Sequence, residues 1–231
     1  MSFEKNNKLD TKAIVDEIEN AVYKELKPFG FRKHGRTLHR FVDGDISQVI
    51  NFQNGCPEKF IYNVLYVNVG IRVPECELRT FAPEENLKKY YREIDCNIRD
   101  VLDTGDDKNC QGYGLSGPTQ EIIDNVIYGI KNYVLPAFDT LCSRDAILKD
   151  PRSFCGLDGL RRHLTLLEQS MIYGRMGNLD EAKRLFNTNY SDAAKNYKAH
   201  EGWKLFNYLK AHLSYLEELA QSLNIEIDDK I

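Results

Sequence analysis

Residues 26–45 read LKPFGFRKHGRTLHRFVDGD, and the stretch continues through VINFQ (49–53) to LYVNVGIRV (65–73). A helix ends near its beginning, because Pro28 pushes the residue before it out of the helical region and Gly30 lets the chain turn. Runs rich in β-branched and aromatic residues follow, separated by turn residues, which is typical of strands. The stretch therefore predicts an α+β architecture in which a sheet begins directly after a helix.

Three consecutive strands are expected after that helix. Arg36–Val42 and Ile46–Gln53 are joined by Asp43-Gly44, a pair typical of a tight hairpin turn. Within Lys59–Val73 apolar residues alternate with other side chains, and this period of two indicates a strand with one face on a core. Because the connections are short, the three strands should form an antiparallel meander.

Helices and one further strand complete the first part of the chain. The first helix is expected to begin at Asp10 or Thr11, because both residue types suit a helix N-terminus. Residues Glu121–Leu135 show helical spacing of apolar side chains, and Pro136 should end or kink that helix. The remaining elements expected here are a short helix and a fourth strand, at Glu84–Tyr91 and Cys96–Leu102.

From about Pro151 onward the pattern is wholly helical. Asp180 is expected to cap a helix that runs through Phe186, and Ser191 to cap the last helix. The phrase YGRMGNLDEAKRLF (173–186) resembles the middle of a tetratricopeptide repeat. One such unit predicts a single helical hairpin, because a solenoid needs about three repeats.

These elements define the expected fold class and its division. We expect an α+β domain over residues 1–148, in which an antiparallel sheet of about four strands packs with helices. An all-helical C-terminal extension should follow over residues 149–231. Its apolar stripes are too rich to remain in water, so the extension should dock on the first domain. With 231 residues, 42% of them hydrophobic, the chain can bury such a core.

Composition and charge favour a protein of the cytoplasm. The formal net charge of −4 argues against a dedicated nucleic-acid or membrane-surface protein, which is usually basic. The N-terminal residues lack the basic-then-apolar pattern of a signal peptide, and no apolar run approaches the roughly 18 residues that span a bilayer. The six cysteines contain no C-x-x-C pair, so we expect free thiols rather than disulfides.

The sequence contains no recognisable catalytic or metal-binding constellation. Gly112–Gly117 matches the G-x-G-x-x-G dinucleotide motif, but an acidic loop precedes it where the motif requires an apolar strand. His34 and His39 lie five residues apart, so one regular strand would place them on opposite faces. We therefore expect no catalytic residue, no metal and no cofactor. Cysteine–histidine catalysis stays an alternative, because such partners meet in space rather than in sequence.

Polar residues of the expected sheet are the candidate binding residues. Arg36 and Arg40 share one face of their strand, and Asn51 and Gln53 share one face of the next. Asn68 lies among apolar and aromatic residues of the third strand. Antiparallel pairing can bring some of these groups together on one surface, which would suit a carboxylate, a phosphate or a polar protein surface. The alternative is a solvated sheet face with cross-strand hydrogen bonds.

The same stretch carries a family resemblance. LKPFGFRKHGRTLHRF, followed by VINFQ and YVNVGI, resembles the bacterial family called domain of unknown function 4304, over roughly the first 145 residues. Members show a similar L-x-P-x-G-F, G-R-T, I-N-F-Q and V-N-L-G-V progression. The family's tryptophan pair is replaced by QGYGLSG (111–117). The resemblance implies a fold and a bacterial origin but no activity, and some relatives occur in toxin–immunity neighbourhoods.

Together these observations predict a protein that acts by binding. Basic residues gather within residues 24–40 and acidic ones within Glu93–Asp107, and such segregation favours a protein partner, an immunity-type inhibitor of a toxin being one form. The alternative is an anionic small molecule or single-stranded nucleic acid, held on the sheet by Arg36, Arg40 and the strand amides. A third hypothesis is that the protein is an enzyme whose active site the sequence does not reveal. No membrane partner is expected.

Overall fold

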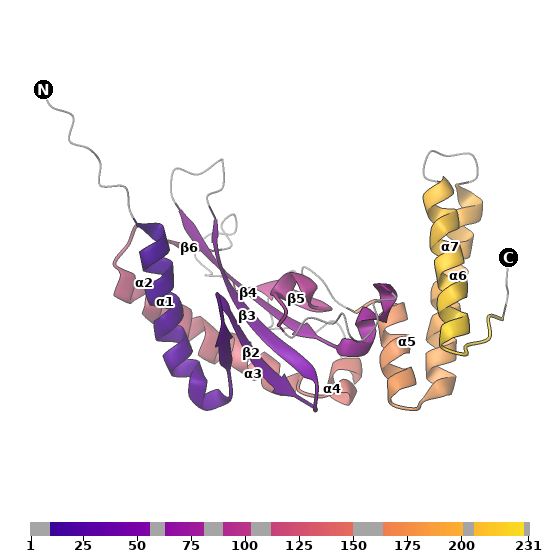
Figure 1. Ribbon diagram of the computed structural model, residues 1–231, viewed down its shortest axis with the longest axis horizontal. Coiled ribbons are helices and arrows are strands. Elements are labelled where there is room, and N and C mark those ends of the chain that lie inside the picture. The colour runs from indigo at the N-terminus through magenta and orange to yellow at the C-terminus, as the bar shows by residue number, and fades with distance from the viewer. Residues whose placement is uncertain are drawn as a thin grey trace, which may run out of the picture. The chain divides into compact units, whose positions relative to one another are not determined.

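The computed structural model describes residues 10–55, 63–80, 90–102, 112–149, 164–200 and 206–228, with the side chains of 78–80 excepted. Two compact units divide the chain (Figure 1). The sheet unit comprises Met1–Val73 and Lys88–His163, and the helical unit comprises Pro74–Leu87 and Leu164–Ile231.

An antiparallel sheet forms the centre of the sheet unit, which confirms the predicted meander. Among the described residues five strands pair in chain order, and a short sixth pairs with the beginning of the fourth. At the predicted hairpin, Asp43 and Gly44 both have positive φ, of 48° and 82°. The strands are β1 (Arg32–His34), β2 (Thr37–Val42), β3 (Ile46–Gly55), β4 (Val64–Arg72), β5 (Ile98–Val101) and β6 (Tyr113–Gly114).

The sheet unit's main helix, α1 (Thr11–Leu26), begins where the sequence predicts. The Asp10 carboxylate accepts a hydrogen bond from the backbone N–H of Ala13 at 3.1 Å. The helix buries one apolar stripe against the sheet, as its spacing indicates. The other helices in the described part of this unit are η1 (Lys27–Phe29), η4 (Glu93–Asp95), α2 (Thr119–Gly129), the π-helix η5 (Ile130–Val134), α3 (Leu135–Thr140) and α4 (Arg144–Lys149).

Pro136 neither stops nor breaks the helical path. Proline lacks an N–H and its ring clashes with the carbonyl four residues earlier, which normally ends a helix. Here the π-helix η5 precedes α3, and the N–H of Leu135 bonds to the carbonyl of Ile130, five residues back. This wider turn lets Pro136 occupy the first turn of α3, so α2, η5 and α3 follow one another without a loop.

The two faces of the sheet differ in what covers them. Figure 1 shows α1, α2 and α3 gathered on one side of it, and α3 contacts β3 through the side chain of Gln48, which donates to the carbonyl of Phe138. This helix-covered face carries most of the apolar core of the unit. Its buried strand residues include Leu38, Ile46, Ile50, Phe52, Leu65, Val67, Val69 and Ile71.

The helical unit is built from η2 (Pro74–Thr80), α5 (Leu166–Arg175), α6 (Leu179–Ala199) and α7 (Phe206–Ser222). The predicted hairpin is confirmed, since α5 and α6 join through a tight turn in which Gly177 has φ of 82°. Its core contains Leu167, Met171, Phe186, Tyr190, Leu213 and Leu216.

Two helix starts in this unit differ from the sequence predictions. Asn178, rather than Asp180, caps α6 by accepting from the N–H of Glu181. Ser191 lies inside α6 and caps nothing, because buried Tyr190 and Ala194 continue the apolar face of the helix past it. Packing of that face outweighs the local preference of serine for a cap.

Segment η2 belongs to the helical unit although it follows β4 directly in the chain. The Cys76 thiol is 1% exposed and lies 3.7 Å from the carbonyl of Glu168 in α5. No local pattern predicts this assignment, and the docking of the extension on the first domain stays a prediction. The expected helix at 84–91 and the acidic residues at 103–107 fall largely or wholly outside the described ranges.

Candidate functional site

The five candidate binding residues lie on opposite faces of the sheet. Pairing of Arg40 with Gln48 places Arg40 on the helix-covered face, and Arg36, at the β1–β2 turn, bonds to α1 on the same side. Pairing of Asn51 with Asn68 places both amides on the other face, together with Gln53. The structure therefore brings the three amides together and separates them from the arginines.

Both arginines already have carboxylate partners. Arg36 forms an ion pair with Asp16 of α1 at 2.9 Å. Arg40 pairs with Asp139 of α3 at 2.7 Å, and its Nε donates to Gln48 Oε1 at 2.6 Å. Its guanidinium also lies 5.1 Å from the centre of the Phe31 ring. These contacts join the sheet to its covering helices, which gives the two arginines a role in the fold.

The amides form cross-strand hydrogen bonds. Asn51 donates to the Thr37 hydroxyl at 2.9 Å, and Asn68 donates to Gln53 Oε1 at 3.1 Å. Asn51 and Asn68 are buried, whereas Gln53 is exposed. This arrangement corresponds to the alternative interpretation of these residues, in which the strands satisfy one another's polar groups.

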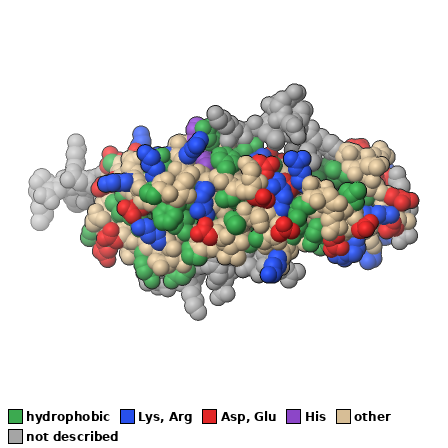
Figure 2. Space-filling view, turned by 90° about the horizontal axis from the view of Figure 1, so that it is seen from below, with side chains coloured by type: hydrophobic (Ala, Val, Ile, Leu, Met, Phe, Trp, Pro, Cys, Tyr) green, Lys and Arg blue, Asp and Glu red, His purple; other side chains and the backbone are tan. Residues whose placement is uncertain are grey.

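Charge on the described surface is mixed rather than segregated. Within the basic stretch Lys33 pairs with the buried Glu19 carboxylate at 2.7 Å, in addition to the two arginine pairs. Figure 2 shows Lys and Arg side chains interspersed with Asp and Glu on the face in view. The basic stretch is therefore partly neutralised within its own unit, while the acidic residues at 103–107 lie outside the described ranges.

A second group of polar side chains is buried on the sheet face opposite the helices, here called the polar face. It consists of Thr37, His39, Ser47, Asn51, Asn68 and Arg72. Of these, His39 and Ser47 are at most 1% exposed, and neither ring nitrogen of His39 nor the Ser47 hydroxyl has a hydrogen-bond partner among the described residues. Such atoms are commonly satisfied by ordered water or a small polar ligand.

The two strand histidines share the polar face, which corrects the sequence prediction. The His34 ring stacks on the Tyr90 ring with centres 4.0 Å apart, and the His39 ring contacts Tyr90 at a tilted angle with centres 5.5 Å apart. They belong to different strands, β1 and β2, so the single-strand alternation rule does not apply across the intervening turn. Burial, and to a lesser extent the neighbouring His34, lowers the pKa of His39 to about 4, so the ring is neutral at pH 7.

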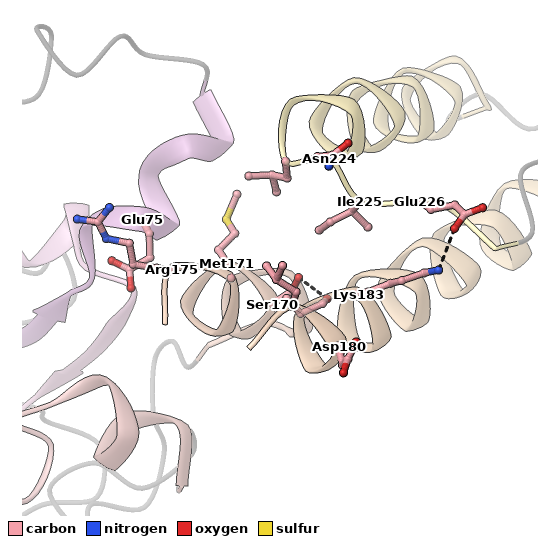
Figure 3. A pocket seen from close by; sticks show the side chains of 13 residues that line it. Glu75, Ser170, Met171, Arg175, Asp180, Lys183, Asn224, Ile225 and Glu226 are labelled. Carbon is pink, nitrogen blue, oxygen red and sulfur yellow. Dashed lines mark hydrogen bonds and ion pairs between the residues drawn. The ribbon is translucent and has the colours of Figure 1, made fainter. Parts of the chain in front are cut away.

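The helical unit contains an open pocket of about 500 Å³, a size typical of ligand and anchor sites (Figure 3). Its apolar floor comes from α5, α6 and the segment after α7, where Met171 and Ile225 point toward each other across the gap. The lining residues are Glu75, Ser170, Met171, Gly174, Arg175, Leu179, Asp180, Ala182, Lys183, Leu223, Asn224, Ile225 and Glu226.

Apolar side chains continue from the pocket onto the surface. Leu179, which lines the pocket, is 69% exposed, and Met176 in the same α5–α6 turn is 39% exposed. Exposed large apolar residues beside a concave apolar site are typical of interaction surfaces. The sequence signal was present in RMGNLD (175–180), where two large apolar residues flank a Gly-Asn turn that would ordinarily be polar.

Charged groups line the pocket with a small excess of carboxylates. Lys183 bonds to Asp228 at 3.1 Å and to Glu226 at 3.2 Å, and hydrogen bonds to these two carboxylates raise the pKa of its ammonium group. Figure 3 shows Arg175 on the same side of the pocket as Glu75, while Asp180 lies at the outer edge of α6. Among the described residues Asp180 has no ion-pair partner.

The fold defines an α+β class of protein with an antiparallel sheet and a separate helical unit. A family model described as Domain of unknown function (DUF4304) matches residues 22–140, so the chain belongs to this family, as the sequence motifs predict. No curated protein and no solved structure gives a significant match. All pocket residues except Glu75 lie beyond the matched range.

Two properties of the described residues bear on the kind of site. No group of three or more His, Cys, Asp or Glu side chains in that part of the chain is placed to hold a metal ion. None of the helices in the described ranges is both long enough and apolar enough to cross a membrane.

Proposed function

We propose that this protein is a non-catalytic binding protein whose partner is another protein. The observation that carries the proposal is the pocket of the helical unit, with an apolar floor, a charged rim and the exposed Leu179 and Met176 beside it. Such a pocket accepts a large apolar side chain of a partner, and one buried anchor of this kind often supplies most of an interface's binding energy. A bacterial, cytoplasmic interaction module of the immunity type is the finer form of this proposal.

Ion pairs on the sheet also favour a protein partner over an anionic ligand or nucleic acid. Arg36 and Arg40 are paired with Asp16 and Asp139, so an anionic ligand would have to compete with carboxylates already in place. The two carboxylates would also lie close to such a ligand and repel its negative charge, which weakens the anion or nucleic-acid alternative. The pocket, in contrast, presents apolar surface with no such competitor among the described residues.

The test uses a variant that fills the pocket without disturbing the helix. An ideal Cβ at Gly174 would lie 3.9 Å from the Ala182 side chain, an ordinary contact, so Gly174→Leu directs a side chain toward the pocket wall. Leucine also has a higher helix propensity than glycine, so α5 should remain folded. Gly174→Ala is the matched control, because it makes the same backbone change without filling the space.

Wild type and both variants are used to capture proteins from the native host, and each protein retained by wild type but not by Gly174→Leu is purified. Calorimetry with the purified protein should give micromolar or tighter binding to wild type and Gly174→Ala, and at least tenfold weaker binding to Gly174→Leu. If no purified protein binds wild type, or if all three chains bind equally, the proposal is wrong.

A further inference from the structure

One wall of the pocket is formed by residues 223–226, which follow α7, rather than by a helix. Asn224 has φ of 54°. Its N–H bonds to the carbonyl of Gln221, and the N–H of the next residue bonds to the carbonyl of Ala220. These two bonds form a Schellman motif, in which a left-handed residue ends the helix and turns the chain. The wall therefore begins at a well-defined turn.

After this turn Ile225–Asp228, here called the strap, continues as irregular chain. Ile225 and Ile227 are half-buried and pack against the core of the helical unit, whereas Glu226 and Asp228 are exposed. Side chains that alternate in this way are typical of an extended chain with one face on a core. The strap thus places Ile225 opposite Met171, across the gap of the pocket (Figure 3).

Asn187 of α6 holds the backbone of the strap. Its amide nitrogen donates to the carbonyl of Glu226 at 3.0 Å, and its amide oxygen accepts from the N–H of Asp228 at 3.0 Å. A residue of a neighbouring strand bonds an extended chain through the same two kinds of group. The amide nitrogen also donates to the carbonyl of Lys183, one turn earlier in α6, at 3.2 Å, which helps to fix the orientation of the amide.

Lys183 contacts the side chains of the strap, but these contacts are exposed. Its ammonium group lies 3.2 Å from the Glu226 carboxylate and 3.1 Å from that of Asp228, and both carboxylates are mostly in solvent. Exposed ion pairs of this kind contribute little, because water and salt screen them. The two backbone bonds of Asn187 therefore do more than Lys183 to fix the path of the strap.

We infer that Asn187 is a positioning residue of the pocket: it does not line the pocket, but it fixes the strap and so holds Ile225 opposite Met171. The inference rests on the proposed function and deepens it. An apolar side chain of a partner binds best between walls that are already in place, since a loose segment must be ordered on binding. Release of the strap therefore weakens the binding of the partner.

A double-mutant cycle with the partner protein purified in the capture experiment tests this role. Asn187→Ala should weaken binding to the full-length protein about three- to tenfold, since one net hydrogen bond changes an equilibrium by about that factor. Ile225→Ala should weaken it about tenfold, and the double variant no further, because Asn187 acts only through Ile225. Additive losses would show that Asn187 serves the fold alone, and would overturn the inference.

Side-chain dynamics of the free full-length protein give a second measurement, which needs no partner. The methyl order parameter of Ile225 should fall in Asn187→Ala, whereas that of Leu213, in the core of the same unit, should stay as in wild type. Asn196→Ala is the matched control and should change neither. Asn196 lies exposed on α6, and its side chain has no hydrogen-bond partner among the described residues.

Asp228→Pro tests the same contact from the strap. Proline removes the N–H that bonds to Asn187 and leaves α6 unchanged, so the variant should loosen Ile225 even if Asn187→Ala folds poorly. An Ile225 methyl group as ordered as in wild type, in either variant, would overturn the inference.

The outcomes separate this inference from the proposed function. A loosened Ile225 in a protein that captures no partner keeps the positioning role and removes the function. A purified partner that Gly174→Leu excludes, but that Asn187→Ala binds as wild type does, keeps the function and removes the positioning role.

Discussion

The sheet unit and the helical unit place their polar side chains differently. In the sheet unit most of the candidate binding residues, Arg36, Arg40, Asn51 and Asn68, bond to groups of the same unit. The buried His39 ring has no hydrogen-bond partner among the described residues. In the helical unit an apolar pocket with charged side chains around it remains open. Most of the candidate binding residues thus already have partners within the sheet unit, whereas the pocket of the helical unit stays open.

Truncation after Lys149 should have the largest effect, because it removes α5, α6 and α7 at once. Cys76 and Glu75 are buried within the helical unit and would then be exposed together with the rest of η2. Each buried leucine that is lost removes about 1.5–3 kcal/mol of stabilisation. The fragment should aggregate or be partly unfolded in size-exclusion chromatography and circular dichroism. A soluble monomer with an unchanged melting temperature would show that the extension is a separate module.

Arg40→Ala tests whether the sheet's charged residues serve the fold. The change removes the ion pair with Asp139 and the hydrogen bond to Gln48. The Oε1 atom of Gln48, which is buried, then loses the Arg40 donor. The free energy of unfolding should fall by about 2–3 kcal/mol, measured by urea denaturation. Arg32→Ala is the control, since Arg32 is exposed and has no described partner, and its effect should stay within about 0.5 kcal/mol.

Binding measurements on the same variants sharpen the comparison. At temperatures where Arg40→Ala remains folded, it should bind the purified partner protein as wild type does. Weaker binding by folded Arg40→Ala would show that the binding site includes the sheet rather than the pocket alone.

His39 should make the stability of the sheet unit depend on pH. Its pKa is about 4 in the folded protein and about 6.5 when unfolded, so the unfolded chain binds the additional proton between these values. Stability therefore falls as pH decreases from 6.5 toward 4, by on the order of 1–3 kcal/mol. His39→Phe should remove this part of the pH dependence, whereas His212→Gln, at an exposed position of α7, should not. If the stability of wild type and of His39→Phe changed with pH in the same way, the pH dependence would not come from His39.

Gly30→Val should give the smallest of these effects. Gly30 has φ of 86°, which a β-branched residue adopts only with strain, and the nearest side-chain atom to a new Cβ would be Arg40 Cδ at 3.9 Å. The cost should therefore come from the backbone, at about 1–2 kcal/mol, and Gly30→Asn should cost less. Thermal denaturation measures both. A Val variant as stable as wild type would show that the turn can relax.

Local signals predicted most of the fold. Asp10, the Asp43-Gly44 hairpin and the alternating runs of β3 and β4 are each specified by neighbouring residues, and each is present in the structure. The exceptions arise where packing decides. Ser191 is a good cap residue, but it stands between Tyr190 and Ala194, whose burial continues α6.

The site was less predictable because its parts are distant in the chain. A period of two assigns Arg40 to one face of a strand, but it does not reveal that Asp139, 99 residues later, lies on that face. The histidines were assigned to opposite faces because the short β1 strand was not recognised. The pocket draws on η2, on the α5–α6 hairpin and on the segment after α7, and no local pattern joins these three regions.

Amide and methyl chemical-shift mapping of the binding of the purified partner protein tests the central claim most directly, because it reports on both units at once. The account predicts shifts at residues that line the pocket, such as Met171, Ala182 and Ile225, and their loss in Gly174→Leu but not in Gly174→Ala. Shifts centred instead on Asn51 and Asn68, or shifts that persist in Gly174→Leu, would contradict it.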